Sequence, residues 1–319
     1  MTSSRNKTRA TALLFYSLLP ALVLIGIRCG TAQSPKQQSF QSAEDAVVAM
    51  VDALKTNDQA SLVAIFGPEA DEVMKSGDEV ADRRGRDLFI AAYHERSVLD
   101  GDEKKKILQI GGEDWPFSVP LVREEAGWRF DTIAGIGELH YRRIGRNELA
   151  AIATCKAYVA AQEEYAMEGH DRSPPGIYAQ KFRSDPGKQN GLYWEVLPGE
   201  EESPLGLLAA EAAAEGYTGS SEKPTPFRGY YFRILAAQGP SSEGGARSYL
   251  VNGEMRNGFA LLAYPAEYGN SGVMSFLVNQ NGIVYEKDLG EETAKLAGET
   301  QVYNPDDTWE PVDIQDQEL

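Results

Sequence analysis

Residues that could carry out chemistry are few and scattered in this sequence. The three histidines stand at positions 94, 140 and 170, so they form neither an HExxH-type motif nor a histidine cluster for a metal ion. Two cysteines, Cys29 and Cys155, are too few for a disulfide scaffold or a cysteine-rich zinc site. The sequence also lacks a GxSxG elbow, a P-loop and a GxGxxG turn. It leaves the question of enzymatic activity open and favours a non-catalytic protein.

One candidate ligand-binding group lies in the first half of the chain. Tyr93 and His94 fall on a predicted helix, and Asp87 precedes His94 by seven residues on roughly the same face, as a base and carboxylate pair would. Trp115 follows the acidic pair 113–114, and such a combination occurs in sugar-binding sites. The sequence favours the interpretation that these are ordinary polar surface residues. A ligand-binding pocket formed by Tyr93, His94 and Trp115 is the alternative.

A basic cluster stands out because the chain is acidic. Arg142, Arg143 and Arg146 fall within six residues, whereas the whole sequence has 31 basic and 48 acidic residues and a net charge of −17. The arginines could contact an anion or a protein partner, which makes them the candidate partner-binding residues. The sequence favours a second interpretation, in which they pair with nearby carboxylates at a domain boundary.

The acidic balance itself excludes some partners. A surface of this charge repels the phosphates of nucleic acids and anionic lipid head groups. Near the C-terminus, Asn304, Asp306 and Asp307 offer oxygen ligands of the kind that calcium prefers. The sequence favours a plain acidic tail over a calcium site here, and no other cofactor is predicted.

The N-terminal segment has the composition of an export signal. Basic residues precede an apolar run over 10–27, and the small residues of 30–32 allow cleavage before Gln33. We therefore predict a signal peptide over 1–32, a location in the periplasm or outside the cell, and no membrane span in the mature chain. An uncleaved anchor is the alternative. Lipid attachment at Cys29 is disfavoured, because Arg28 occupies the place where a small residue is expected.

Helical patterns come first in the mature chain. Ser42 can cap a helix that ends at Asn57, and further helical patterns follow up to Tyr93. After Gly101 the pattern changes to strands, with a hairpin turn over 124–127. This order predicts an α+β domain over 33–140, with helices on one face of an antiparallel sheet.

A second domain of the same class is predicted over 148–303. Two glycines, Gly135 and Gly137, and the arginine cluster suggest a basic linker over 141–147, followed by a helix over 148–167. Cys155 falls on the apolar stripe of this helix, so we expect it to be buried. Four strands are predicted, over 230–235, 259–264, 273–278 and 283–287, and an acidic tail over 304–319.

Several long sequence runs resemble one family. They are Arg146-Asn147-Glu148-Leu149, Tyr178-Ala179-Gln180-Lys181-Phe182-Arg183-Ser184, Phe227-Arg228-Gly229-Tyr230-Tyr231-Phe232 and Ala263-Tyr264-Pro265-Ala266-Glu267-Tyr268-Gly269. The chain resembles, over essentially its whole mature length, the secreted bacterial proteins of domain of unknown function family 2950. That resemblance implies export but no accepted activity.

The order of elements gives two weaker resemblances. The second half resembles the globular head of type IV pilins and type II secretion pseudopilins, without their hydrophobic polymerisation helix. The first half resembles nuclear-transport-factor-like or cystatin-like folds. A fold of this kind does not determine a function.

These observations together predict an exported protein of the bacterial envelope. The leading hypothesis is a non-catalytic binding or assembly component with another envelope protein as its partner. The alternative is a protein that binds, or hydrolyses, a small molecule or glycan in a pocket of the N-terminal domain.

Overall fold

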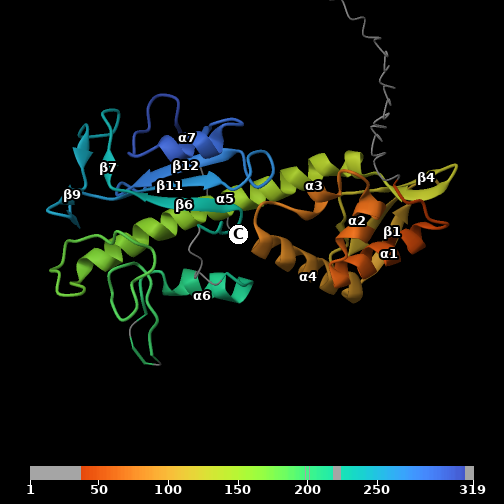
Figure 1. Cartoon of the computed structure of the whole chain (residues 1–319), viewed down its shortest axis with the longest axis horizontal. Helices are drawn as coiled ribbons and strands as arrows, with labels where there is room; N and C mark the ends of the chain where they lie inside the picture. The colour runs from red at the N-terminus through yellow and green to blue at the C-terminus, as the bar shows by residue number, and fades with distance from the viewer. Residues whose placement is uncertain (1–36, 198, 201, 218–223, 313–319) are drawn as a thin grey trace, which may run out of the picture. The chain divides into compact units, whose positions relative to one another are not determined.

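The computed structural model confirms an α+β protein built from helices and antiparallel sheets (Figure 1). It describes residues 37–312, except for 198, 201 and 218–223. The predicted signal peptide with Cys29, and residues 313–319 of the predicted tail, lie outside the described residues.

The first part of the described chain has four helices and one sheet. The helices are α1 (Ala43–Thr56), α2 (Gln59–Phe66), α3 (Ala70–Met74) and α4 (Glu79–Glu95). The strands are β1 (Ser97–Gly101), β2 (Lys105–Ile110), β3 (Trp115–Pro116), β4 (Leu121–Glu124) and β5 (Gly127–Phe130). The antiparallel sheet has the order β1-β2-β4-β5, and β3 pairs with β2.

Local sequence signals explain how these elements begin and end. The Ser42 hydroxyl accepts a hydrogen bond of 3.0 Å from the amide of Asp45, which confirms the predicted cap of α1. Asn57 ends that helix in the left-handed conformation, with φ 51°. The predicted hairpin is also confirmed, because Leu121 pairs with Phe130 and Glu124 with Gly127. A hydrophobic core forms between α1, α2 and this sheet.

Helix α5 (Thr132–Met167) runs for 36 residues and includes the segment that we predicted to be a linker. Residues 141–147 are therefore helical, and the helix predicted over 148–167 is only its second half. Gly135 does not loosen the chain. A Cβ atom at this position would lie 2.5 Å from the Cα of Val119, so the absence of a side chain lets the helix lie directly against the preceding loop.

The second part of the described chain has a further antiparallel sheet with the order β14-β13-β12-β11-β6. Its strands are β6 (Tyr230–Leu235), β11 (Ala260–Pro265), β12 (Met274–Asn279), β13 (Tyr285–Asp288) and β14 (Glu310–Pro311). The helices are α6 (Gly206–Glu215) and α7 (Thr293–Glu299), and two small ribbons are formed by β7 (Ala237–Gln238), β8 (Arg247–Ser248), β9 (Leu250–Val251) and β10 (Glu254–Met255). Strand β14 shows that part of the predicted tail belongs to the sheet.

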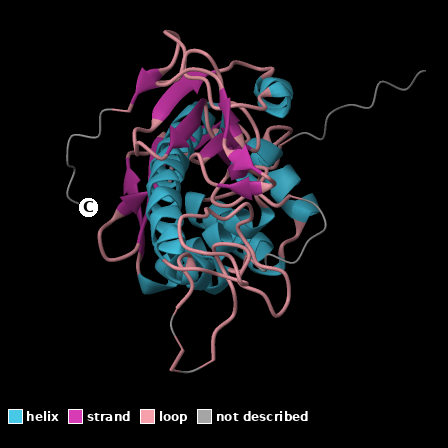
Figure 2. Ribbon diagram, turned by 90° about the vertical axis from the view of Figure 1, so that its left-hand side faces the viewer, coloured by secondary structure: helices cyan, strands magenta, loops and turns pink. Residues whose placement is uncertain are grey.

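The second half of α5 packs against the middle of this sheet, where it contacts β11 and β12 (Figure 2). Residues 260–263 of β11 are fully buried there. Cys155 is buried in the same core, as predicted, and burial raises the pKa of its thiol to about 12. This thiol is therefore a small hydrophobic core residue.

A buried carboxylate connects the start of α4 with the second part of the chain. One oxygen of Asp78 accepts hydrogen bonds from the amides of Val80 and Ala81, at 3.1 and 3.0 Å, and so caps α4. The other accepts from the Tyr217 hydroxyl at 2.7 Å and from the amide of Gly229 at 2.9 Å. Four donors around one fully buried carboxylate make this contact specific in geometry.

The described residues thus contain two separate hydrophobic cores, and α5 takes part in the second while its first half lies beside α3. The division into two domains at 33–140 and 148–303 stays a prediction. Among the described residues, no helix is both long and apolar enough to cross a membrane.

Candidate functional site

A pocket of about 220 Å³ lies between α1, α4 and α5, and we call it the α4–α5 pocket. Its apolar surface comes from Met50 and Leu54 of α1, Phe66 at the end of α2, Phe89 of α4 and Phe117. The rings of Phe89 and Phe117 meet edge to face, with centroids 5.3 Å apart. A concave apolar surface of this kind is the usual floor of a small-molecule site, although the volume lies slightly below the range of about 300–1,000 Å³ found for drug-sized ligands.

The face of α4 that lines the pocket carries small residues, Ala81 and Gly85, among larger ones. None of its residues is buried. Ala81, Asp82, Gly85, Arg86 and Phe89 recur at helical spacing and all line the pocket. In the middle of this face, a Cβ atom at Gly85 would meet no other atom within 4 Å. Gly85 is also exposed, so it lies at the open side of the pocket, where a larger side chain would narrow the opening.

The charge of the pocket is opposite to that of the chain. Its lining contains four arginines, Arg86, Arg142, Arg143 and Arg146, and a single acid, Asp82. The sequence as a whole has a net charge of −17. An excess of positive charge on a partly enclosed surface attracts anions, because the low-dielectric walls focus the field.

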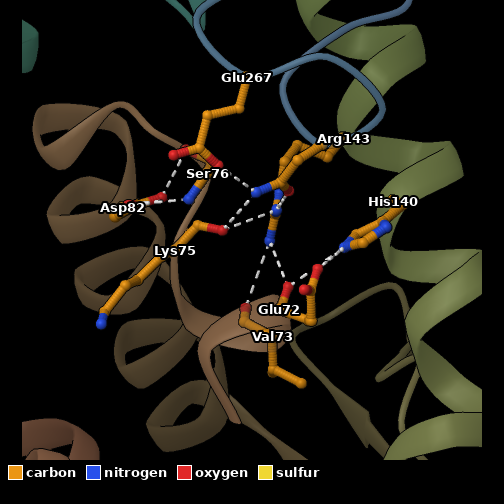
Figure 3. A network of polar contacts seen from close by, with 9 residues as sticks. Glu72, Val73, Lys75, Ser76, Asp82, His140, Arg143 and Glu267 are labelled. Atoms are coloured by element: carbon orange, nitrogen blue, oxygen red, sulfur yellow. Dashed lines mark hydrogen bonds and ion pairs between the residues drawn. The ribbon is translucent and has the colours of Figure 1, made fainter. Parts of the chain in front are cut away.

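Two of the four arginines are already bonded within the protein, and Arg143 is one of them (Figure 3). Its guanidinium donates to the carbonyls of Glu72, Val73 and Lys75, at 3.4, 3.3 and 3.1 Å, and to the side-chain oxygen of Asn270. These carbonyls end α3, so the cation neutralises the negative end of that helix. Burial lowers the pKa of Arg143.

Arg142 is the second occupied arginine. It donates to Glu138 at 2.6 Å and to the carbonyl of Pro116 at 2.9 Å. Its guanidinium carbon lies 5.2 Å from the ring centroid of Trp115, within cation–π range. The Trp115 side chain remains 46% exposed, so this pair forms the rim of the pocket.

Arg86 and Arg146 differ from these two. Within the part of the chain that the structure describes, the guanidinium of neither residue forms a hydrogen bond or an ion pair with another side chain or with the backbone. One comes from α4 and the other from α5, so they line the pocket from two different helices. They are the groups of the lining with unused charge and unused donors.

Asp82 is bonded to the neighbouring loop. One of its oxygens accepts from the Ser76 hydroxyl at 2.6 Å and the other from the Ser76 amide at 3.1 Å. Burial raises the pKa of Asp82, although the hydrogen bonds from Ser76 and the charge of Arg143 act in the opposite direction. Its carboxylate is thus held by Ser76, and within the described part of the chain no hydrogen bond or ion pair joins it to Arg86 or Arg146.

The structure brings some predicted site residues together and separates others. Trp115 and the arginine cluster, which were predicted for two different sites, line the same pocket. Tyr93 and His94 lie on α4 outside its lining, with ring centroids 5.5 Å apart. Sequence reasoning missed Asp82, Gly85 and Arg86, although a signal existed: the run 83–86 reads Arg-Arg-Gly-Arg, much like 142–146.

The predicted metal ligands have other roles in the structure. Asn304 accepts from the amide of Ser241 at 2.8 Å, and Asp306 accepts from Thr308. Asp307 is exposed. Among the described residues, no group of three or more His, Cys, Asp or Glu side chains is placed to hold a metal ion.

The comparisons with known proteins give one match. Residues 37–312 match the family described as a protein of unknown function, DUF2950. No curated protein and no solved structure matches the chain significantly. The resemblances to pilin heads and to nuclear-transport-factor-like folds therefore stay predictions.

Proposed function

The chain belongs to the DUF2950 family of proteins of unknown function, and we propose that it is an exported, non-catalytic protein that binds a small molecule in the α4–α5 pocket. The observation that carries the proposal is the concave, mainly apolar surface between α1, α4 and α5, with four arginines in its lining. A concave apolar surface with a few polar groups is the usual form of a small-molecule site. The export signal in the sequence supports a location outside the cytoplasm.

The side chains around the pocket favour binding over catalysis. Ser76 is the hydroxyl nearest to a base, and its hydrogen bond goes directly to Asp82. A carboxylate is a weak base for a serine, and the usual activated serine has an imidazole between the two groups. The arginines supply charge and hydrogen-bond donors, which orient a ligand, and cannot accept a proton.

A role in envelope assembly has less support from the same residues. Arg142 and Arg143 were the centre of the predicted partner contact, and both are bonded within the chain. Arg146 alone of the three has its guanidinium available, so a partner contact through this cluster would rest on one side chain.

Filling the pocket tests the proposal. The neutral fluorescent probe N-phenyl-1-naphthylamine is titrated into the purified protein without its signal peptide. We expect saturable binding at one site, and we expect Gly85→Leu to weaken it at least about tenfold, because the new side chain occupies the space of the probe. Gly145→Leu is the matched control, since Gly145 is also a helical glycine with open space but lies outside the lining.

Two results would count against pocket binding. The first is a wild-type protein that shows no saturable binding of the probe. The second is equal binding by wild type, Gly85→Leu and Gly145→Leu, which would place the probe elsewhere. Circular dichroism and a thermal melt establish that both variants are folded before they are compared.

A further inference from the structure

We propose that the natural ligand of the α4–α5 pocket is an amphipathic anion, with a short apolar body against Leu54, Met74 and Phe89 and an anionic head group held by Arg86 and Arg146. This inference rests on the proposed function, because it assigns a ligand class to the same pocket. It goes further in naming the two residues that select the ligand by charge.

The first step in the argument is the set of partners that each arginine has. Arg142 and Arg143 form part of the protein's own framework, through Glu138, the carbonyl of Pro116 and the end of α3. Arg86 and Arg146 have no such partners among the described residues. A guanidinium beside an apolar surface leaves five N–H donors that water serves less well than an anion does.

The second step is the absence of a competing acid within the lining. Asp82 is the one carboxylate there, and both of its oxygens accept from Ser76. Among the described residues, no acid forms an ion pair with Arg86 or Arg146, and this leaves the position for an external anion.

The third step concerns the body of the ligand. The walls are aromatic and aliphatic. Met50, Phe66 and Phe117 are buried, whereas Leu54, Met74 and Phe89 are partly exposed and supply accessible apolar surface. An inorganic anion or acetate would leave this surface in contact with water, whereas a medium-chain aliphatic or an aromatic body would cover it. Apolar walls together with free arginines therefore select for a molecule that has both an apolar body and an anionic head group.

The head group and the body are tested separately with matched probes. Decanoate and decyl phosphate carry an anionic head, decanol has the same chain without charge, and acetate has the head without the chain. Affinities are measured by displacement of N-phenyl-1-naphthylamine and by isothermal titration calorimetry. For the wild type we expect decanoate or decyl phosphate to bind at least about tenfold more tightly than decanol, and acetate not to bind.

Substitution of the two free arginines should remove this preference. In the double variant Arg86→Gln/Arg146→Gln, we expect decanol to bind as before and the anionic probes to bind no more tightly than decanol. Arg83→Gln is the matched control, because Arg83 lies on the same helix, is exposed and is absent from the lining. Raising the salt concentration should weaken the binding of decanoate and leave that of decanol unchanged.

The results separate this inference from the proposed function. Equal binding of decanol and the anionic probes, still blocked by Gly85→Leu, would overturn the anionic class while the pocket stands. A preference for anions that survives the double substitution would overturn the assignment to Arg86 and Arg146. If no probe binds, or if Gly85→Leu has no effect on any of them, the pocket itself is not the site.

Discussion

The two hydrophobic cores of this protein share a plan and differ in how they are filled. In the second, the residues of α5 that face the sheet include Ile152, Cys155 and Tyr158, all of them buried. In the first, α4 has no buried residue, and Gly85 faces open space. Both cores place helices on an antiparallel sheet. The difference shows that a pocket here is a property of one helix sequence and not of the architecture.

Gln162 in the closed core and two arginines of the pocket lining show a related contrast. In the closed core the side-chain amide of Gln162 is matched on both sides: its nitrogen donates to the carbonyl of Ala179 at 2.8 Å and its oxygen accepts from the amide of Ala179 at 2.8 Å. Around the pocket, Arg86 and Arg146 have no partner among the described residues. Completed hydrogen bonds fix a structure, whereas unused donors beside a cavity are available to a ligand.

The largest effect should come from removing a ring from the closed core. Phe276 is fully buried, so Phe276→Ala should lower the free energy of unfolding by about 3–5 kcal/mol. Phe89 is only half-buried at the pocket wall, and Phe89→Ala should cost about 1–2 kcal/mol, because its ring has solvent on one side. Urea denaturation measures both values. Equal costs would mean that the wall of the pocket is packed like a core.

A smaller effect, of opposite sign, is expected at the open glycine. Gly85→Ala should raise the free energy of unfolding by about 0.5–1 kcal/mol, because alanine is favoured over glycine inside a helix and the added methyl group meets no atom. Gly145→Ala in α5 should give a similar gain for the same reason. Thermal and urea unfolding of both variants and the wild type measure these changes in the free energy of unfolding. A loss of stability at position 85 alone would show that the space in front of it is not open.

Local signals in the sequence were sufficient for much of the fold. The cap at Ser42, the hairpin at 124–127 and the burial of Cys155 each depend on residues close together in the chain, and all three are present. The continuity of α5 was missed because it depends on distant contacts. Gly135 fits against Val119, and Arg143 binds the end of α3, so packing stabilises a helix through residues that locally favour a break.

The candidate site, like α5, depends on contacts between residues that are far apart in the sequence. The sequence identified Trp115 and the cluster at 142–146 as unusual, yet assigned them to different sites. Their proximity depends on how α5 lies against the loop that carries Pro116, as the bond from Arg142 to that carbonyl shows. The face of α4 with Gly85 and Arg86 could have been found by comparing the two Arg-rich runs, but nothing in either run indicates that they face one pocket.

The smallest expected effect appears only on titration, at the one acid of the pocket lining. Burial raises the pKa of Asp82 above its value in the unfolded chain, which is about 3.9. The folded protein therefore binds this proton more tightly than the unfolded chain does. The contribution to stability is fully present below the unfolded pKa and is lost as the pH rises through the folded pKa.

Comparison with Asp82→Asn isolates this contribution, because the other titrating groups are common to both proteins. The stability of wild type relative to Asp82→Asn should fall as the pH rises from about 4 to 7. Urea denaturation at several pH values measures the difference. The groups around Asp82 are Ser76, Arg143 and Asp78, and of these Arg143 and Ser76 favour the charged form. A difference that rises with pH would mean that these two outweigh burial and that the pKa of Asp82 is lowered in the folded protein.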